Sequence, residues 1–222
     1  MHGAPGRASE PEKALMSEPS WLTLARELQA LAQTGLAYSK DVYDRQRFSR
    51  IREITAQLAA DGSQTPYETV LGLFQRDSGY PTPKIDVRGA VFRDGEILMV
   101  REAHDGKWTL PGGWADVNQS AAECLVREIL EESGFRTRAT KLAAVWDYRR
   151  QGHQPAHPAS IYKLFFLCEI VGGAPAPSEE TTEVAFFPRD ALPVLSGGRI
   201  TPAQIARMFQ HGEAPERPTD FD

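Results

Sequence analysis

This chain of 222 residues has little cysteine, no long hydrophobic run and no strong excess of either charge. Its two cysteines, Cys124 and Cys168, imply no disulfide framework, and we expect both to be buried as reduced thiols. No apolar run approaches the ~20 residues that a membrane span needs, and residues 1–20 lack an apolar segment of the signal-peptide type. The chain is therefore expected in a reducing cytoplasm, without a membrane partner.

The charge balance also limits the partners. The 25 basic and 30 acidic residues give a formal net charge of −5, which argues weakly against a nucleic-acid or membrane surface. One predicted helix has a basic side, but acidic residues interleave and no helix-turn-helix pattern is clear. The basic residues are Arg45, Arg47, Arg50 and Arg52. We therefore do not expect nucleic acid as a partner.

The composition changes along the chain and predicts its domains. Residues 1–19 are rich in proline, glycine, alanine and charge, and we expect disorder there. Residues 20–78 predict a small helical unit, residues 79–84 a proline-containing linker, and residues 85–211 the main domain. The tail of residues 212–222 is again predicted to be disordered.

The helical unit carries apolar residues at helical spacing. We expect Gly35 and Gly62 to end the first two helices, with these residues facing inward: Trp21, Leu24, Leu28 and Leu31, then Phe48, Ile51, Ile54 and Leu58. So small a unit cannot hold a large core alone. Its aromatic residues therefore predict a homodimer interface: Trp21, Tyr38, Tyr43, Phe48 and Tyr67.

The main domain mixes strand and helix patterns. The Asp94-Gly95 turn predicts a hairpin, and further strands are expected at residues 108–110, 141–150, 160–170 and 183–188. A polar loop, residues 151–159, holds His153 and His157, which we treat as loop residues first and substrate contacts second. Thr201 and Pro202 open a last helix, so the pattern predicts an α/β domain with a mixed sheet.

The stretch from Leu110 to Phe135 organises this domain. Pro111-Gly112-Gly113 can bend sharply and bring bare backbone close to a ligand. Residues 120–133 predict a helix that Gly134 caps, and these residues are expected to face inward: Ala122, Leu125, Val126 and Ile129.

The other side of this helix carries Glu128, Glu131 and Glu132. Like charges at this spacing cost roughly 0.2–0.5 kcal/mol per pair, and acids near a helix C-terminus oppose its dipole. A divalent cation removes both costs, and Mg²⁺ takes oxygen ligands and bridges to substrate phosphates. We therefore predict a carboxylate-lined Mg²⁺ site beside a glycine loop, suited to a phosphate ester or anhydride.

The same stretch resembles the signature of the Nudix hydrolases, G-x5-E-x7-R-E-U-x-E-E-x-G-U, where U is apolar. Gly113 is the opening glycine, and the second half matches at Arg127, Glu128, Ile129, Glu131, Glu132, Gly134 and Phe135. Gln119 departs from the signature, which has Glu there. Flanking segments resemble the branch with an N-terminal helical segment, which includes CDP-choline and ADP-ribose pyrophosphatase-like enzymes. The resemblance implies an α/β/α sandwich with a mixed sheet.

The resemblance also implies an activity and its metal. A nucleoside diphosphate linked to a moiety X would be hydrolysed to a nucleoside monophosphate and phosphorylated X, with Mg²⁺ or Mn²⁺. Carried over by position, Glu128 and Glu132 are the main metal ligands, Glu131 a third, and the Gly112 carbonyl completes the set. Arg127 would hold these glutamates in place.

Gln119 leaves two interpretations open. If the family glutamate is an essential ligand, catalysis is in doubt, because an amide oxygen has no anionic pull. If that residue only braces the loop, Gln is tolerable, and the nearby Asp116 could supply charge. We expect an active enzyme.

Further site residues are candidates on position. Family members draw a catalytic Glu from a loop before a later strand; here Glu180 is our choice over Glu179 and Glu183. Trp114 could stack on a base or belong to the core. Arg88 and Arg101 could hold phosphate oxygens or be ordinary strand arginines, and three more residues could reach the substrate: Asp147, Tyr148 and Arg149.

Two other functions stay open at this stage. One is a house-cleaning pyrophosphatase of nucleoside triphosphates, and the other is a nucleotide-sensing regulator without catalysis. The identity of X, the base preferred, the number of metal ions and the phosphorus attacked do not follow from the residues.

Overall fold

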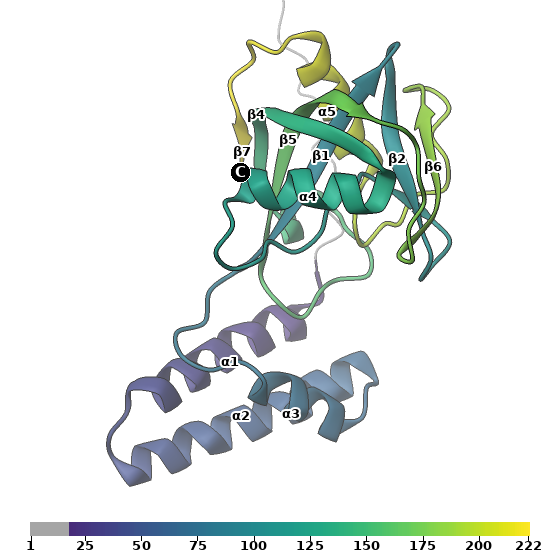
Figure 1. The fold of residues 1–222 in the computed structure, drawn as a ribbon. Helices are drawn as coiled ribbons and strands as arrows, with labels where there is room; N and C mark the ends of the chain where they lie inside the picture. Colours follow the sequence, from purple (N-terminus) through teal and green to yellow (C-terminus); the bar gives the residue numbers. More distant parts are fainter. Residues whose placement is uncertain (1–17) are drawn as a thin grey trace, which may run out of the picture.

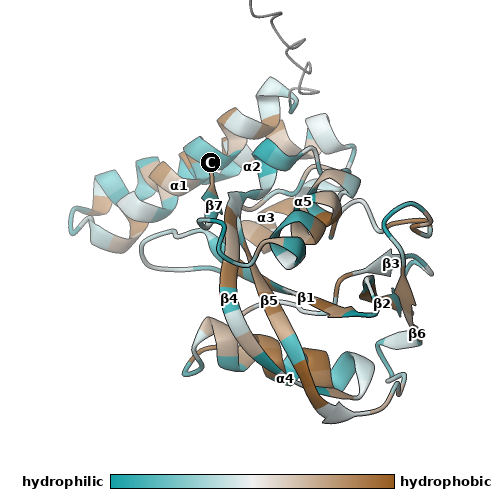
Figure 2. Ribbon diagram, turned by 90° about the horizontal axis from the view of Figure 1, so that it is seen from above, coloured by the Kyte–Doolittle hydropathy of each residue, from teal (hydrophilic) through white to brown (hydrophobic). Residues whose placement is uncertain are grey.

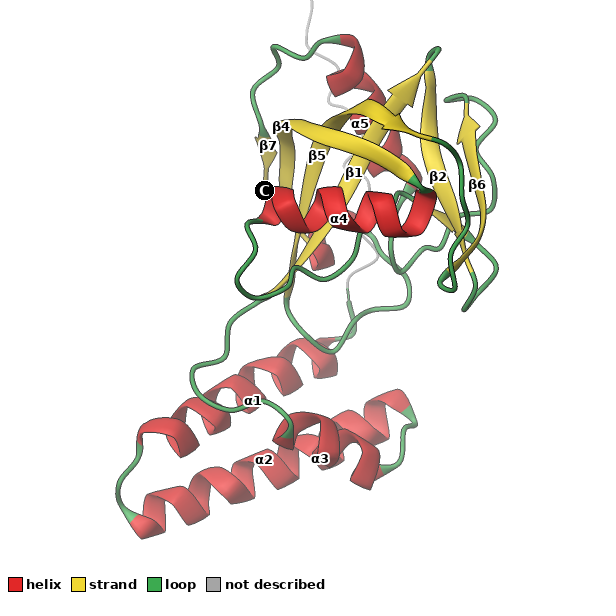
Figure 3. Cartoon of the chain, in the orientation of Figure 1, coloured by secondary structure: helices red, strands yellow, loops and turns green. Residues whose placement is uncertain are grey.

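The computed structural model describes residues 18–222, which form a helical unit and a sheet domain joined by residues 76–83 (Figures 1 and 3). The disorder predicted for residues 1–19 falls almost wholly outside the described residues. Within residues 18–222, no helix is both long and apolar enough to cross a bilayer.

Three helices build the first unit: α1 (Ser20–Tyr38), α2 (Val42–Ser63) and α3 (Tyr67–Gln75). Small buried residues let α1 and α2 approach closely: Ala25, Ala32, Ala56, Ala59 and Ala60. A Cβ on Gly35 would lie 2.3 Å from the Phe48 ring, and one on Gly62 would lie 2.3 Å from Trp21. These glycines therefore lie inside their helices and make room for aromatic rings; the prediction that they end the helices is wrong.

The expected inward stripes are also partly wrong. Leu24 and Leu31 are 53% and 57% exposed, and Ile54 is exposed as well, because alanines occupy the contact between α1 and α2. The aromatic residues of the unit differ in burial: Trp21 packs within the unit, while Tyr38 lies on its surface. An apolar stripe is therefore left uncovered on α1.

The second unit contains one mixed sheet in the order β3-β2-β1-β5-β4-β7, with β6 paired to β2. Its strands are β1 (Lys84–Arg93), β2 (Glu96–Glu102), β3 (Trp108–Thr109), β4 (Phe135–Asp147), β5 (Ile161–Gly173), β6 (Thr181–Phe187) and β7 (Asp220–Phe221). β1 runs parallel to β5 and antiparallel to β2. The predicted β1–β2 hairpin is confirmed, with φ of 53° at Asp94 and 82° at Gly95, both on the positive side that a type I′ turn needs.

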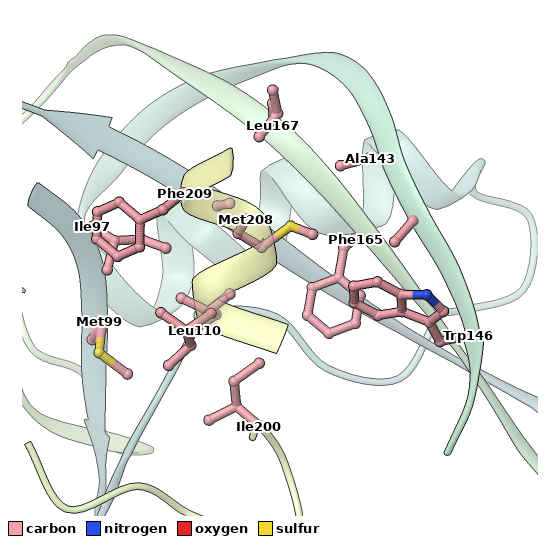
Figure 4. Close-up of a cluster of buried hydrophobic side chains, with 13 residues drawn as sticks. Ile97, Met99, Leu110, Ala143, Trp146, Phe165, Leu167, Ile200, Met208 and Phe209 are labelled. Carbon is pink, nitrogen blue, oxygen red and sulfur yellow. The ribbon is translucent and has the colours of Figure 1, made fainter. Parts of the chain in front are cut away.

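A helix covers each face of this sheet, as the predicted α/β/α sandwich requires. Helix α4 (Ala121–Ser133) packs Leu125 and Ile129 against one face, and α5 (Pro202–Glu213) packs Ile205, Met208 and Phe209 against the other (Figure 4). Strand β5 is largely hydrophobic between the two helices, whereas β4 mixes hydrophobic and hydrophilic residues (Figure 2). Each helix therefore has its own core, and β1 contributes to both.

The end of the chain is ordered, so the disorder predicted for residues 212–222 is wrong. Helix α5 continues to Glu213, and β7 pairs in parallel with β4. Thr219 Oγ1 donates to the Leu142 carbonyl at 2.7 Å, and Asp220 forms an ion pair with Arg207 and lies 3.0 Å from His211 Nε2. These partners come from distant segments, which the composition of the tail does not reveal.

Candidate functional site

The Pro-Gly-Gly turn lies directly on strand β1. The Gly113 carbonyl accepts from Val87 N at 2.8 Å, and the Pro111 carbonyl accepts from Gly89 N at 2.9 Å. Gly112 has φ of +131°, and a Cβ there would lie 2.0 Å from the Val87 carbonyl oxygen. Only glycine fits this position, because the backbone conformation and the space both exclude a side chain.

Helix α4 is fixed at both ends, which sets the direction of its glutamates. Ser120 and Glu123 form a capping box at the N-terminus, and Gly134 caps the C-terminus with φ of 76°. Glu132 then reaches the turn, where its Oε2 accepts from Gly112 N at 2.7 Å. A Cβ on Gly113 would meet Glu128 Oε2 at 3.2 Å, so Glu128 also borders the turn.

These two glutamates carry an electrostatic cost. Glu132 is only 5% exposed, and burial raises its pKa to about 7 despite the opposing effects of Arg88 and the Gly112 N–H. Burial likewise raises the pKa of Glu128, whose neighbour Arg127 acts in the other direction. Two desolvated carboxylates beside an open turn are oxygen donors that suit a divalent cation such as Mg²⁺.

Oxygen and sulfur donors of Asp116, Cys124 and Glu128 also lie within 4.8 Å of one another. Cys124 Sγ, however, donates to the Trp114 carbonyl at 3.4 Å, and a thiol is a poor ligand for a hard cation. This group therefore adds no ligand for Mg²⁺ beyond Glu128 and Asp116.

Arg127 connects the helix to the loop before it. Its guanidinium binds Glu131 at 2.6 Å, Asp116 at 2.7 Å and Glu128 at 2.8 Å. Its Nε donates to Gln119 Oε1 at 3.3 Å. Gln119 thus braces Arg127 in this structure, and Asp116 supplies the carboxylate charge. Glu131 is exposed and turned toward Arg127.

Two residues that were not singled out in the sequence join the site. Glu102, at the end of β2, is buried, and its Oε1 has no hydrogen-bond partner among residues 18–222. Its Oε2 lies 3.1 Å from Arg199 Nη2. Burial raises the pKa of Glu102, and the charges of Arg88 and Arg199 oppose that shift. A single acid that ends an apolar strand gives no local sign of this role.

The three candidate loop glutamates differ in their surroundings. The Glu180 carbonyl accepts from Ala103 N at 2.9 Å, and its charge raises the pKa of both Glu128 and Glu102. Its carboxylate forms no hydrogen bond or ion pair within the described part of the chain. Glu183 instead pairs with Arg101 at 2.5 Å. The Glu179 carboxylate also has no such partner there, so what distinguishes Glu180 among the three is that its charge acts on Glu128 and Glu102.

Arg88 is too deeply buried to serve as an exposed phosphate contact. It is 2% exposed, and it binds Asp86 through Nε at 3.0 Å and Nη2 at 2.9 Å. Its Nη1 donates to the Leu110 carbonyl at 3.1 Å, and Lys163 shares Asp86 at 2.6 Å. Arg88 is thus committed to a buried network behind the turn, and neither role considered for an exposed strand arginine applies.

The remaining candidates are Trp114, which follows the glycine turn, and residues in or after the last part of β4. Trp114 follows the turn and is 48% exposed, with its ring 6.1 Å from that of His157. Asp147 and Arg149 pair with each other at 2.7 Å, at the end of β4. Within residues 18–222, neither Asp147 nor Arg149 forms a hydrogen bond or ion pair with the glutamates of α4. His153 is buried and stacks on Tyr148 at 4.2 Å, and burial lowers its pKa to about 4.

Comparison with known proteins agrees with this geometry. Residues 83–209 match the NUDIX domain, and residues 19–74 match a domain described as UDP-X-like, N-terminal oligomerisation domain. The chain is 45% identical to the "Putative ADP-ribose pyrophosphatase YjhB" of Bacillus subtilis (strain 168) over 205 residues, which cover 92% of this chain and 98% of that protein.

The similar solved structures include the two that follow. A crystal structure of a UDP-X diphosphatase has a TM-score of 0.59 at 31% identity, covering 91% of this chain and 98% of its own. An ADP-ribose pyrophosphatase from Streptococcus suis 89-1591 has a TM-score of 0.58 at 38% identity, covering 64% and 100%. With the signature helix, the glycine turn and both domain matches in place, the chain belongs to the Nudix hydrolases, enzymes that act on phosphorus-containing acid anhydrides, and carries a UDP-X-like N-terminal domain.

Proposed function

We propose that this protein is a Mg²⁺-dependent pyrophosphohydrolase of nucleoside diphosphates linked to a moiety X, of the ADP-ribose or CDP-choline type. The products would be a nucleoside monophosphate and phosphorylated X. The observation that carries the proposal is Glu132, a buried carboxylate held by Gly112 N beside Glu128, with a pKa of about 7. The names of the similar proteins support a nucleoside diphosphate and add uridine to the bases worth testing.

Glu128, Glu132 and the Gly112 carbonyl would hold the metal. When bound, Mg²⁺ neutralises the diphosphate, activates water and orients the leaving oxygen. Arg127 keeps Glu128 aligned, with Asp116 and Gln119 as its brace. Glu131 would join the ligands only after its bond with Arg127 opens. Arg199 lies beside Glu102, and its guanidinium suits a phosphate.

A substrate panel tests the reaction. ADP-ribose, CDP-choline and UDP-glucose are incubated with Mg²⁺ in heavy-oxygen water, and the products are identified by mass. Nucleoside monophosphate and phosphorylated X are expected, and the labelled product shows which phosphorus is attacked. Pyrophosphate from nucleoside triphosphates would favour the house-cleaning activity instead. Metal-dependent binding with no cleavage of any diphosphate would favour the regulator.

Glu180 is proposed as the general base that takes the proton of the attacking water. Glu180→Gln keeps the shape but cannot accept the proton, so kcat should fall about 100-fold or more while KM stays within roughly threefold. Glu179→Gln is the matched control and should retain activity. Unchanged turnover in Glu180→Gln would remove this residue from the mechanism.

The helical unit is proposed to form a homodimer. The matching domain is described as an oligomerisation domain, and α1 leaves Leu24, Leu31 and Tyr38 exposed at seven-residue spacing. Seven residues are close to two helical turns, so the three side chains share one face. A second copy of the chain would cover that stripe.

A further inference from the structure

One side chain of the helical unit reaches into the catalytic domain. Arg26 of α1 places Nε at 3.1 Å from the carbonyl oxygens of both His157 and Pro158, and its Nη2 donates to His157 as well. Glu18 holds the other side of the guanidinium, with 2.6 Å from Nη1. The Arg26 side chain is almost wholly buried. Its donors are therefore used to fix the backbone of a loop more than 130 residues further along the chain.

That loop places the ring of His157 next to Trp114. The His157 ring lies edge-on to Trp114 at 6.1 Å and to Tyr148 at 6.0 Å. Its Nδ1 accepts from Ala159 N at 3.0 Å, which leaves the proton on Nε2. Burial lowers the pKa of His157, which favours the neutral ring. The His157 ring is thus held in one orientation beside Trp114.

Trp114 is tied to the catalytic turn. It follows Gly113, its carbonyl accepts from Cys124 of α4, and its backbone bridges to Asp86 of β1. Nearly half of its side chain is nevertheless exposed. With its backbone held beside the Pro-Gly-Gly turn and nearly half of its surface exposed, Trp114 can serve as a stacking platform for a flat ring such as a nucleobase.

We propose that Arg26 is a positioning residue for substrate binding: by fixing the loop at His157 and Pro158, it holds His157 against Trp114 and completes a nucleobase subsite. The helical unit then has a role in cis, separate from assembly. This inference rests on the proposed function, because it assumes that a nucleoside diphosphate occupies the catalytic turn.

The test compares Arg26→Ala with Arg47→Ala, a control that removes an exposed arginine paired with Asp44 in the same unit. Arg26→Ala should raise KM for ADP-ribose and the Kd of AMP about tenfold, with kcat within twofold and the oligomeric state unchanged by light scattering. Arg26→Lys should restore only part of the affinity, because an ammonium lacks the planar fork that serves two carbonyls and Glu18. Arg47→Ala should behave as the wild type.

Two further measurements separate positioning from general support. For a diphosphate of two ribose 5-phosphates, which carries no base, KM should be the same in wild type and Arg26→Ala. In the background of Trp114→Ala, removing Arg26 should cost little more, because the stacking partner is already gone. If Arg26→Ala folds poorly, His157→Ala tests the same subsite and should weaken AMP binding.

The inference is overturned if KM and Kd do not change in Arg26→Ala, if the base-free compound is affected equally, or if the effects of Arg26 and Trp114 simply add. Titration with AMP needs no turnover. A wild type that binds AMP but cleaves no diphosphate would therefore end the proposed function while leaving Arg26 open to the same test.

Discussion

At the scale of single residues, the site depends on carboxylates that are buried before any ligand arrives. Glu132 and Glu102 both sit at about 5% exposure, in surroundings that favour their neutral forms. Such strain is typical of functional sites, where perturbed pKa values gather. It gives this site a measurable signature in the metal-free protein.

Glu132 predicts a dependence of stability on pH. Its folded-state pKa is about 7 against 4.5 for an ordinary glutamate, so between these values the folded protein keeps a proton that the unfolded chain has lost. Stability without metal should therefore fall as pH rises through this window. Relative to that of the wild type, the free energy of unfolding of Glu132→Gln should rise by about 2–3 kcal/mol between pH 5 and pH 8. Urea unfolding in EDTA measures this difference.

Glu131→Gln is the control for that measurement, because Glu131 is exposed and should alter this difference little. A Glu132→Gln variant whose stability follows the wild type at every pH would contradict the assignment of the pKa of about 7 to this carboxylate.

At the scale of elements, the turn and the signature helix act as one piece. The turn hydrogen-bonds to β1, while α4 packs on the same sheet through Leu125 and Ile129. The link between them is the hydrogen bond from Gly112 N to Glu132. A shift of the turn should therefore move Glu132, a proposed metal ligand.

Gly112→Ala tests that link. The new Cβ would meet the Val87 carbonyl at 2.0 Å and would need a φ that alanine avoids, so the turn must move. We expect a loss of roughly 2–4 kcal/mol in stability and at least tenfold weaker Mn²⁺ binding by calorimetry. Gly152→Ala is the control, since Gly152 also has positive φ but no atom within 4 Å of its Cβ position. Equal losses in both variants would show that backbone strain alone, without the contact at Val87, accounts for the effect.

At the scale of the whole molecule, the helical unit has two surfaces with different surroundings. One face of α1 carries Arg26 and touches the catalytic domain, while the stripe of Leu24, Leu31 and Tyr38 is open. These faces separate the two roles that we propose for the unit, assembly and support of the substrate loop.

The combined change Leu24→Lys and Leu31→Lys should convert the dimer to a monomer, because it places two charges in an apolar contact. Light scattering measures this directly. Val171→Lys, which alters an exposed apolar residue of the catalytic domain, should leave the dimer intact. A wild-type protein that is monomeric at every concentration tested would refute the dimer.

The elements that could be predicted from the residues are those stabilised by interactions between near neighbours in the chain. The Asp94-Gly95 hairpin and the capping box at Thr201 depend on residues a few positions apart, and so does the helix from Ser120 to Gly134. The rigid spacing of the signature also identified the family and its glutamates.

Which side chains are buried, and which distant residues meet, became known from the fold. Leu24 is exposed because alanines fill the contact between α1 and α2, and Arg88 is buried in a pair with Asp86. The C-terminal tail is ordered because β7 pairs with β4. Glu102, Arg199 and Arg26 reach their partners across the fold. Burial and long-range pairing depend on contacts between segments far apart in the chain, which no local pattern of residues records.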